Sequence, residues 1–353
     1  MIFKTLNSFH RHLRYTCYGL VGLLFMAASC AKDPKVLEPG WIELQIAVPE
    51  NKVVEETRHG VDEPGTTAES KINRLTIFVF NTNNTFETYK TLEIASDNTS
   101  TDPMWDPVRS AIRVLATPGQ KRIYAVANWT IPATTEMPDI SNITDTTALI
   151  GVVRVHNNIM PTNSPVMSGR MTVTIAGGEQ NLKMYLTRQI ARVEIFPMIS
   201  ANANALGANV SIEGVKFMGL AQRAYLFGRG TTSPVATVWD NTAYVGATSG
   251  QVTATTNAAA VKYSTTYIPE YFGSSGTHTY MMIKAKYNGT DTYYSVPINA
   301  LTGASPSMYA VERNHSYRYY LTIQGVGSAT GLVSPFNNND PGVYNISYQV
   351  EKR

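Results

Sequence analysis

Short runs of alternating residues, closed by turn residues, constrain the fold of this chain most strongly. Strict alternation of apolar with other side chains places the apolar set on one face of a β-strand. The first such run covers residues 41–48, and its apolar face consists of Ile42, Leu44, Ile46 and Val48. Helical periodicity is scarce, and only residues 146–152 are expected to form a short helix. Short strands separated by turns are typical of β-sandwiches and barrels, so we expect an all-β fold.

Further strands follow at short intervals and end at turn residues such as Gly177-Gly178 and Asn288-Gly289. We expect them at residues 75–80, 111–115, 122–127, 171–175, 189–196, 208–217, 280–287, 292–298 and 316–323. A strand-rich chain of 353 residues favours two β-sandwich domains in tandem. We place the boundary near Asn181, which gives domains of residues 59–181 and 182–353.

The first 29 residues are expected to be a targeting signal and not part of the fold. Lys4, Arg11 and Arg14 precede an apolar run over residues 17–28, which is shorter than the roughly 20 residues that span a bilayer. Small residues directly before Cys30 resemble the bacterial lipobox. We therefore expect Cys30 to carry lipid and to hold the precursor at the outer membrane. The alternative is an ordinary cleaved signal peptide followed by an incidental cysteine.

Composition excludes several classes of function. The sequence has two cysteines, Cys17 and Cys30, so loss of the signal and acylation of Cys30 leave no thiol for a disulfide, a metal or a nucleophile. The formal net charge is +3 and no basic stripe is present, so we expect no nucleic-acid partner. Charged residues make up 16% of the chain and tyrosines number 20, which fits an extracellular β-protein.

Catalytic and cofactor motifs are absent from the sequence. Beyond the signal the histidines show no H-x-x-x-H spacing, and there is no Gly-x-Ser-x-Gly motif, P-loop or dinucleotide fingerprint. We therefore expect no catalytic residue, no cofactor and no metal site, and we do not expect an enzyme. Asp97, Asp102 and Asp106 form a possible calcium cluster, but their Ser-, Asn- and Pro-rich surroundings favour a plain loop.

The alternation of the first strand returns near the C-terminus. There the apolar set is Tyr344, Ile346, Tyr348 and Val350. The two strands of matching pattern lie at the two ends of the chain, and we expect each at a sheet edge. Such a chain can polymerise if its first strand is removed and the C-terminal strand of another copy takes the vacated place. Residues 30–58 would then be a propeptide that contains the removable strand, and it ends at Arg58 in a polar loop of the kind that proteases cut.

Several stretches carry a family resemblance. They are residues 74–81, 191–193, 311–317 and 321–327, and the most specific is the Glu-Arg-Asn-His-x-Tyr run that starts at Glu312. In these stretches the chain resembles the FimA-type major fimbrial subunits, the fimbrillins of type V pili. The resemblance implies an exported lipoprotein that folds as two transthyretin-like β-sandwiches.

The resemblance also implies a mode of assembly. An arginine-specific protease would cut between Arg58 and His59, which removes the propeptide with its first strand and its lipid. The C-terminal strand of another copy would then replace that first strand by donor-strand exchange. The partners would be copies of this chain and accessory pilus subunits, and the product would be a fimbrium on the cell surface that supports adhesion.

Elementary energetics agree with such a mechanism. Burying four aliphatic side chains of the first strand contributes roughly 6–12 kcal/mol before costs. While the strand is covalently attached it acts at an effective concentration of about 1 mM, an advantage that cleavage removes. The tyrosines of the C-terminal strand are larger than the aliphatic side chains that they would replace, so the groove needs room at its mouth or the register differs.

Two other interpretations stay open. One is a monomeric surface lipoprotein that binds glycan or a host protein, with Trp105, Trp129 and Trp239 as candidate contacts, although packing in the core or in loops is favoured for each. The other is a tip or anchor subunit of the same pilus. A tip subunit would not donate a strand and an anchor would lack the cleavage site, and this sequence has candidates for both features.

Overall fold

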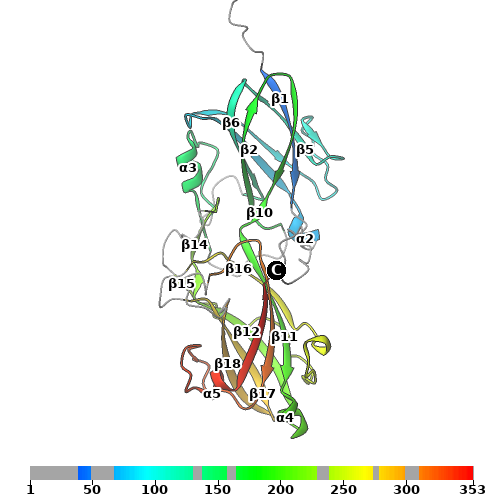
Figure 1. The fold of residues 1–353 in the computed structure, drawn as a ribbon, viewed down its shortest axis with the longest axis vertical. Coiled ribbons are helices and arrows are strands. Elements are labelled where there is room, and N and C mark those ends of the chain that lie inside the picture. The colour runs from blue at the N-terminus through cyan, green and yellow to red at the C-terminus, as the bar shows by residue number, and fades with distance from the viewer. Residues whose placement is uncertain are drawn as a thin grey trace, which may run out of the picture.

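Two β-sandwiches lie end to end along the long axis of the molecule (Figure 1). The computed structural model describes residues 39–48, 67–129, 137–156, 164–228, 238–272, 278–298 and 310–352. The predicted all-β fold with two tandem sandwiches is confirmed. Cys30, Arg58 and His59 lie outside the described residues. Among those that are described, no helix is long and apolar enough to cross a membrane.

The first sandwich packs a four-stranded sheet of order β4-β5-β1-β9 against a five-stranded sheet of order β10-β8-β6-β2-β3. Its strands are β1 (Gly40–Ala47), β2 (Arg74–Asn81), β3 (Phe86–Glu93), β4 (Trp105–Asp106), β5 (Ala111–Ala116), β6 (Gly119–Ala127), β8 (Met167–Ile175), β9 (Glu179–Tyr185) and β10 (Thr187–Arg188). Alternate side chains of both sheets meet in one aliphatic core, in which Leu75, Ile77 and Leu44 are fully buried.

The second sandwich packs sheet β16-β11-β19-β20 against sheet β12-β17-β18. Its strands are β11 (Ile190–Ile199), β12 (Val210–Met218), β16 (Ser264–Pro269), β17 (Tyr280–Tyr287), β18 (Thr290–Pro297), β19 (Ser316–Ile323) and β20 (Ile346–Lys352). The β17–β18 hairpin turns at Asn288 and Gly289, whose φ angles of 51° and 82° belong to the left-handed region that a tight hairpin needs. Tyr317 and Tyr319 are fully buried in the core between the sheets.

Small elements connect and cap the sandwiches. A two-stranded sheet pairs β7 (Val153–Val155) with β14 (Arg223–Tyr225), and another pairs β13 (Leu220–Ala221) with β15 (Val238–Trp239). The helices are α2 (Thr67–Ser70), α3 (Thr146–Gly151), α4 (Ala201–Ala205), α5 (Pro341–Tyr344) and the 3-10 turn η1 (Asn257–Ala259). The predicted short helix is confirmed as α3, which Asp145 caps by accepting a hydrogen bond from the amide of Ala148.

Two predictions about the first sandwich were wrong. β1 is not an edge strand, because β9 pairs with it on the side away from β5. The boundary is not at Asn181, which lies within β9 opposite Glu43, and β10 still pairs with β8 of the first sandwich. The first sandwich therefore continues to Arg188, and the second begins with β11 at Ile190.

Candidate functional site

The space that β1 fills between β5 and β9, here called the β1 site, is the centre of the candidate functional site. β1 runs antiparallel to β5, from Gly40 opposite Ala116 onward, and parallel to β9, from Trp41 opposite Glu179 onward. The structure therefore gives β1 a hydrogen-bonded neighbour on each side. A segment that replaced it would have to satisfy two ladders of backbone groups, since buried backbone groups are costly when unpaired.

The inward face of β1 is the one that alternation predicted. Ile42, Leu44 and Ile46 have exposed fractions of 1%, 0% and 5%, and Val48 packs partly buried against the same core just beyond the strand. Burying three such side chains fully contributes about 5–9 kcal/mol. Removing β1 would thus open an apolar groove in the first sandwich.

The outward face of β1 carries an ion-pair cluster. Glu43, only 8% exposed, accepts a 2.7 Å hydrogen bond from Nη1 of Arg109 and lies 3.5 Å from Nε of Arg113. Arg113 is directly opposite Glu43 on β5 and also pairs with Glu179 at the start of β9. The charges of three neighbouring segments therefore meet over β1. Sequence reasoning missed this cluster, because its members are far apart in the chain.

The three aspartates of the possible calcium cluster serve the loop that positions Arg109. Asp97 accepts hydrogen bonds from Thr99, Asp102 from the Met104 amide, and Asp106 from the amides of Val108 and Arg109. These are side-chain turns of an ordinary polar loop. Among the described residues, no group of three acidic, histidine or cysteine side chains is placed to hold a metal ion.

The C-terminal strand β20 lies at an edge of the second sandwich. It pairs antiparallel with β19, from Ile346 opposite Ile323 to Lys352 opposite Tyr317. Ile346 is 6% exposed, and Tyr348 and Val350 pack partly buried against the core. The predicted start of the strand was wrong: Tyr344 belongs to α5 and is 56% exposed, because Asp340 caps and Pro341 begins a helical turn there.

Three polar contacts of β20 reach other segments. Nζ of Lys352 lies 2.5 Å from Glu312, Nδ2 of Asn257 donates to Gln349 at 2.8 Å, and Nε2 of Gln324 donates to Ser347 at 3.1 Å. These contacts lie on the exposed or partly buried side of the strand, where water competes with them. Main-chain pairing and the inward side chains therefore account for most of its attachment.

The Glu-Arg-Asn-His-x-Tyr signature lies at the joint between the sandwiches. Arg313 contacts both carboxylate oxygens of Glu270, at 2.9 and 2.5 Å, and donates to the carbonyls of Tyr225 and Leu226. Asn314 accepts a 3.0 Å hydrogen bond from Arg188, the last residue of the first sandwich. The signature thus fixes the joint and takes no part in the β1 site.

A second buried group completes the joint from the side of α2. The Glu69 carboxylate pairs with Arg192 at 3.4 Å and accepts a hydrogen bond from the Tyr267 hydroxyl. Burial, followed by the bond to Glu69, raises the pKa of Tyr267 above its ordinary value, so this hydroxyl stays a donor. Arg188 donates to the carbonyl of Glu69 and to Ser70. The helix that follows the candidate cleavage site in the sequence is therefore anchored in the joint.

Two of the three tryptophans proposed as candidate contacts are packing residues. Trp105 is 7% exposed and donates its indole N–H to the carbonyl of Asn98, and Trp129 is 1% exposed and donates to the carbonyl of Pro138. Trp239 lies in β15, where the structure describes its backbone but not its side chain. The favoured interpretation is thus confirmed for Trp105 and Trp129.

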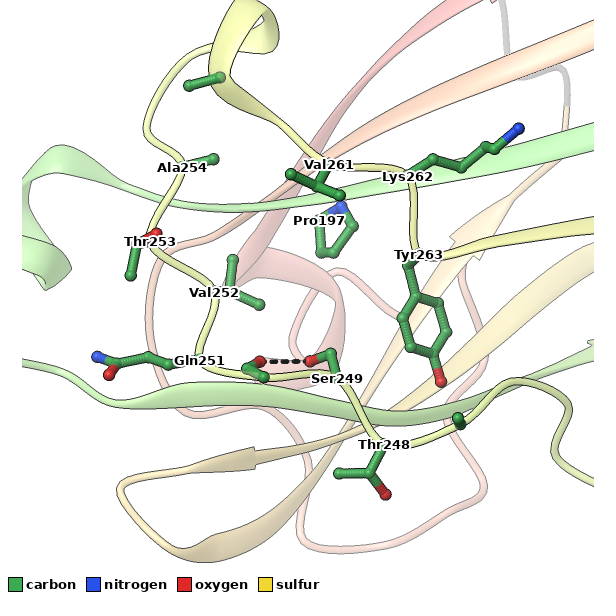
Figure 2. A pocket seen from close by; sticks show the side chains of 13 residues that line it. Pro197, Thr248, Ser249, Gln251, Val252, Thr253, Ala254, Val261, Lys262 and Tyr263 are labelled. Atoms are coloured by element: carbon green, nitrogen blue, oxygen red, sulfur yellow. Dashed lines mark hydrogen bonds between the residues drawn. The ribbon is translucent and has the colours of Figure 1, made fainter.

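A separate pocket of about 360 Å³ lies on the second sandwich (Figure 2). Its apolar lining includes Pro197, Val252, Val261 and the ring of Tyr263, and residues 248–253 supply hydroxyl and amide groups (Figure 2). The size falls at the lower end of the range of small-molecule sites. A binding-module interpretation would have to use this pocket and not Trp105 or Trp129.

A comparison with known protein families matches part of the chain. Residues 42–214 match the model of the family described as the major fimbrial subunit protein (FimA), which confirms the resemblance seen in the sequence. No curated protein matches the chain in sequence.

Solved structures share the fold. A protein assigned to cell adhesion from Parabacteroides distasonis has 19% identity and a TM-score of 0.60, covering 88% of this chain and 96% of that one. A fimbrilin from Porphyromonas gingivalis has 14% identity and a TM-score of 0.56, with 89% and 96% covered. The tip fimbrial protein Mfa3 of the same organism has 15% identity and a TM-score of 0.52, with 90% and 100% covered. At these identities the likeness shows the fold alone.

Proposed function

We propose that this chain is a fimbrial subunit of the FimA type, and that it is a major stalk subunit that polymerises by exchanging β1 for the C-terminal strand of a second copy. The observation that carries the proposal is the placement of β1. It lies inside a sheet and contributes three buried aliphatic side chains, yet Arg58 follows it in the segment that leads to α2. One cut after Arg58 separates β1 from residues 59–353 without breaking another covalent bond.

The order of events follows from the chain. Lipid on Cys30 holds the precursor at the outer membrane, and the lipidated residue lies on the same side of Arg58 as β1. An arginine-specific protease that cuts between Arg58 and His59 therefore releases the subunit from the membrane and ends the covalent attachment of β1 together. While attached, β1 acts at an effective concentration of about 1 mM. After the cut that advantage is gone, so a strand from a neighbouring copy or an accessory pilus subunit can take the place of a β1 segment that dissociates and is diluted.

The donor in this proposal is β20. Its inward residues Ile346, Tyr348 and Val350 match in number and spacing the buried set of β1. Donation requires β20 to leave its own sheet, which costs the burial of Ile346 and one ladder of backbone hydrogen bonds. The β1 site returns two ladders, because it has strands on both sides. β1 gives up the same two ladders when it leaves, so the exchange as a whole loses one ladder of backbone hydrogen bonds, and dilution of the cut segment has to offset that loss.

A disulfide trap tests the proposal. Asn181 on β9 is exposed and is the direct neighbour of Glu43 on β1. Ser347 lies on the outward face of β20, and a donated β20 would bring it to the position of Glu43. In the chain from Ala31 onward, which lacks Cys17 and Cys30, the pair Asn181→Cys and Ser347→Cys should form intermolecular disulfides after cleavage at Arg58 and none before it. The matched control replaces Asn181→Cys by Asn83→Cys, in an exposed turn of the first sandwich.

The outcomes separate the alternatives. A series of cross-linked oligomers that forms only after cleavage at Arg58 supports a stalk subunit. Arg58→Ala should abolish these oligomers while leaving the fold intact. Loss of β1 after the cut without any cross-link indicates a tip subunit, which accepts a strand but does not donate one. Equal cross-linking of the test pair and the control pair would show contact without exchange and would refute the proposal.

A further inference from the structure

The Glu43 cluster, made up of Glu43, Arg109 and Arg113, distinguishes β1 from other segments that could fill the β1 site. Glu43 is nearly as buried as the inward residues, at 8% exposure, although it is on the outward face. Its carboxylate is held by one guanidinium from β5 and one from the loop before β5, at 3.5 and 2.7 Å. A charged side chain buried to this degree is costly unless it is paired, so the cluster specifies what lies at position 43.

The arginines remain in the subunit when β1 leaves. The side chains of Arg109 and Arg113 are 63% and 48% exposed, and each keeps one other acidic neighbour, Asp106 at 3.8 Å and Glu179 respectively. Departure of β1 removes the carboxylate that they share. The rim of the emptied site then carries two guanidinium groups that face the position of an outward side chain.

The C-terminal strand offers no carboxylate at that position. Suppose that the donor runs in the direction of β1. If Ile346, Tyr348 and Val350 replace Ile42, Leu44 and Ile46, the residue opposite Arg113 is Ser347. If Tyr344, Ile346 and Tyr348 replace them, it is Asn345. Both are neutral. Glu351 reaches that position only if the donor slides until Lys352 takes the place of Leu44, which puts a cation into the apolar core.

We propose that the Glu43 cluster is a specificity determinant of the β1 site, which fixes the register of β1 and makes it the preferred occupant over the C-terminal strand. The identity of the competing strand rests on the proposed function, whereas the retention of β1 does not. Because the donor lacks the carboxylate, β1 stays in place until both covalent attachment and local concentration are lost. The cluster thereby guards against exchange between uncut subunits.

The rate at which β1 dissociates from the cleaved protein measures how strongly the Glu43 cluster retains it. The unlipidated chain from Cys30 onward has a single thiol, so a fluorophore on Cys30 reports departure of residues 30–58 by a fall in anisotropy. After cleavage at Arg58, the segment that carries Glu43→Gln should dissociate about tenfold faster than the wild-type segment. The reason is that this substitution removes the charge-assisted contacts with Arg109 and Arg113, which are weakened by the partial exposure of both arginines. Gln45→Asn, on the same outward face and exposed, is the matched control and should release at the wild-type rate.

Two further measurements separate charge from packing. Raising NaCl to about 0.5 M should speed release of the wild-type segment and leave Glu43→Gln unchanged, because only ion pairs are screened. The exchanged pair Glu43→Arg with Arg113→Glu should release more slowly than either single variant. Equal release rates for wild type, Glu43→Gln and Gln45→Asn would overturn the inference.

An acidic scan of the donor tests register. Synthetic peptides of residues 343–353 that carry Asn345→Glu or Ser347→Glu are offered to the cut protein after its own segment has left. One of the two should bind about tenfold more tightly than the unchanged peptide, and the gain should disappear with Arg113→Gln. Binding of all three peptides with equal affinity overturns the inference and leaves the proposed function intact. Binding of a peptide of residues 39–48 but of none of the donor peptides overturns the proposed donor and leaves the inference on β1 intact.

Discussion

Replacement of Leu44 by alanine should weaken the precursor and leave the finished fibre unchanged. Leu44 is fully buried in the core of the first sandwich, among residues such as Leu75 and Ile77. Removing its side chain forfeits the burial of about three methylene or methyl groups and leaves a cavity, so the expected loss in free energy of unfolding is about 3 kcal/mol or more. In the fibre β1 is absent, so the same substitution should cost nothing there.

Urea unfolding of the uncut protein and of isolated fibres measures the two halves of this prediction. In the uncut protein Leu44→Ala should lower the unfolding midpoint with an unchanged denaturant dependence. Fibres that assemble from the variant after cleavage should resist urea as wild-type fibres do. Ile346→Ala is the control, since its side chain is buried in the precursor and in the donor position, and it should weaken both. Fibres weakened by Leu44→Ala as much as the precursor would show that β1 stays in the fibre, and the proposed exchange would be wrong.

Other predictions concern the donor strand, the joint and the response to pH. Ile346→Asp should prevent fibre growth seen by electron microscopy, because a carboxylate in an apolar groove lacks a partner, while Ser347→Asp on the opposite face should be tolerated; equal effects would refute the proposed facing. Arg313→Gln should cost about 3 kcal/mol in urea unfolding, because it strands the buried Glu270 carboxylate, whereas Lys286→Gln in an exposed ion pair should cost about 1 kcal/mol or less; a similar loss for both would show that the joint is not fixed by this pair. Burial, then the charges of Arg154 and Arg313, lower the pKa of His156 from 6.5 to about 3, so the unfolded chain alone binds a proton below pH 6.5 and stability falls as pH falls. From pH 6.5 to 5 the His156 contribution should decline by about 2 kcal/mol, and His156→Gln should lose that part of the slope; an unchanged slope would show that the histidine is not responsible.

The facing of β1 was predictable, but its position inside a sheet was not. Alternation alone identifies Ile42, Leu44 and Ile46 as inward, because the side-chain period of a strand is fixed. The neighbour that makes β1 an inner strand is β9, whose sequence Glu-Gln-Asn-Leu-Lys-Met-Tyr has polar residues on both faces at its start. Because this stretch has no clear strand pattern, the sequence predicts β1 at a sheet edge and the domain boundary near Asn181. Tertiary pairing, and not local propensity, makes these residues a strand.

Local signals were present where the C-terminal strand was predicted too early. Asp340 and Pro341 are a capping residue followed by a proline at the first helical position, a combination that starts a helix. The alternating pattern starts at Tyr344, but the helical turn includes this residue, so the strand begins at Ile346. Pro197 shows the opposite error, since the predicted strand ends at residue 196, directly before this proline, whereas β11 continues to Ile199. Pairing of β11 with β16 stops at Ile195, so the missing N–H of Pro197 breaks no bond to that strand.

The joint explains how removal of one strand leaves the subunit intact as a building block. Glu69 follows Arg58 by 11 residues, so a cut at Arg58 keeps α2 and its buried contacts with Arg192 and Tyr267 in the processed chain. In the proposed fibre the accepted strand lies in the first sandwich and the donated strand comes from the second. Any pull along the fibre then passes through the joint, where Arg313 binds Glu270 and two backbone carbonyls at once. The most specific motif of the sequence therefore supports the connection between the two exchange sites, and it also contacts β20, where Glu312 pairs with Lys352.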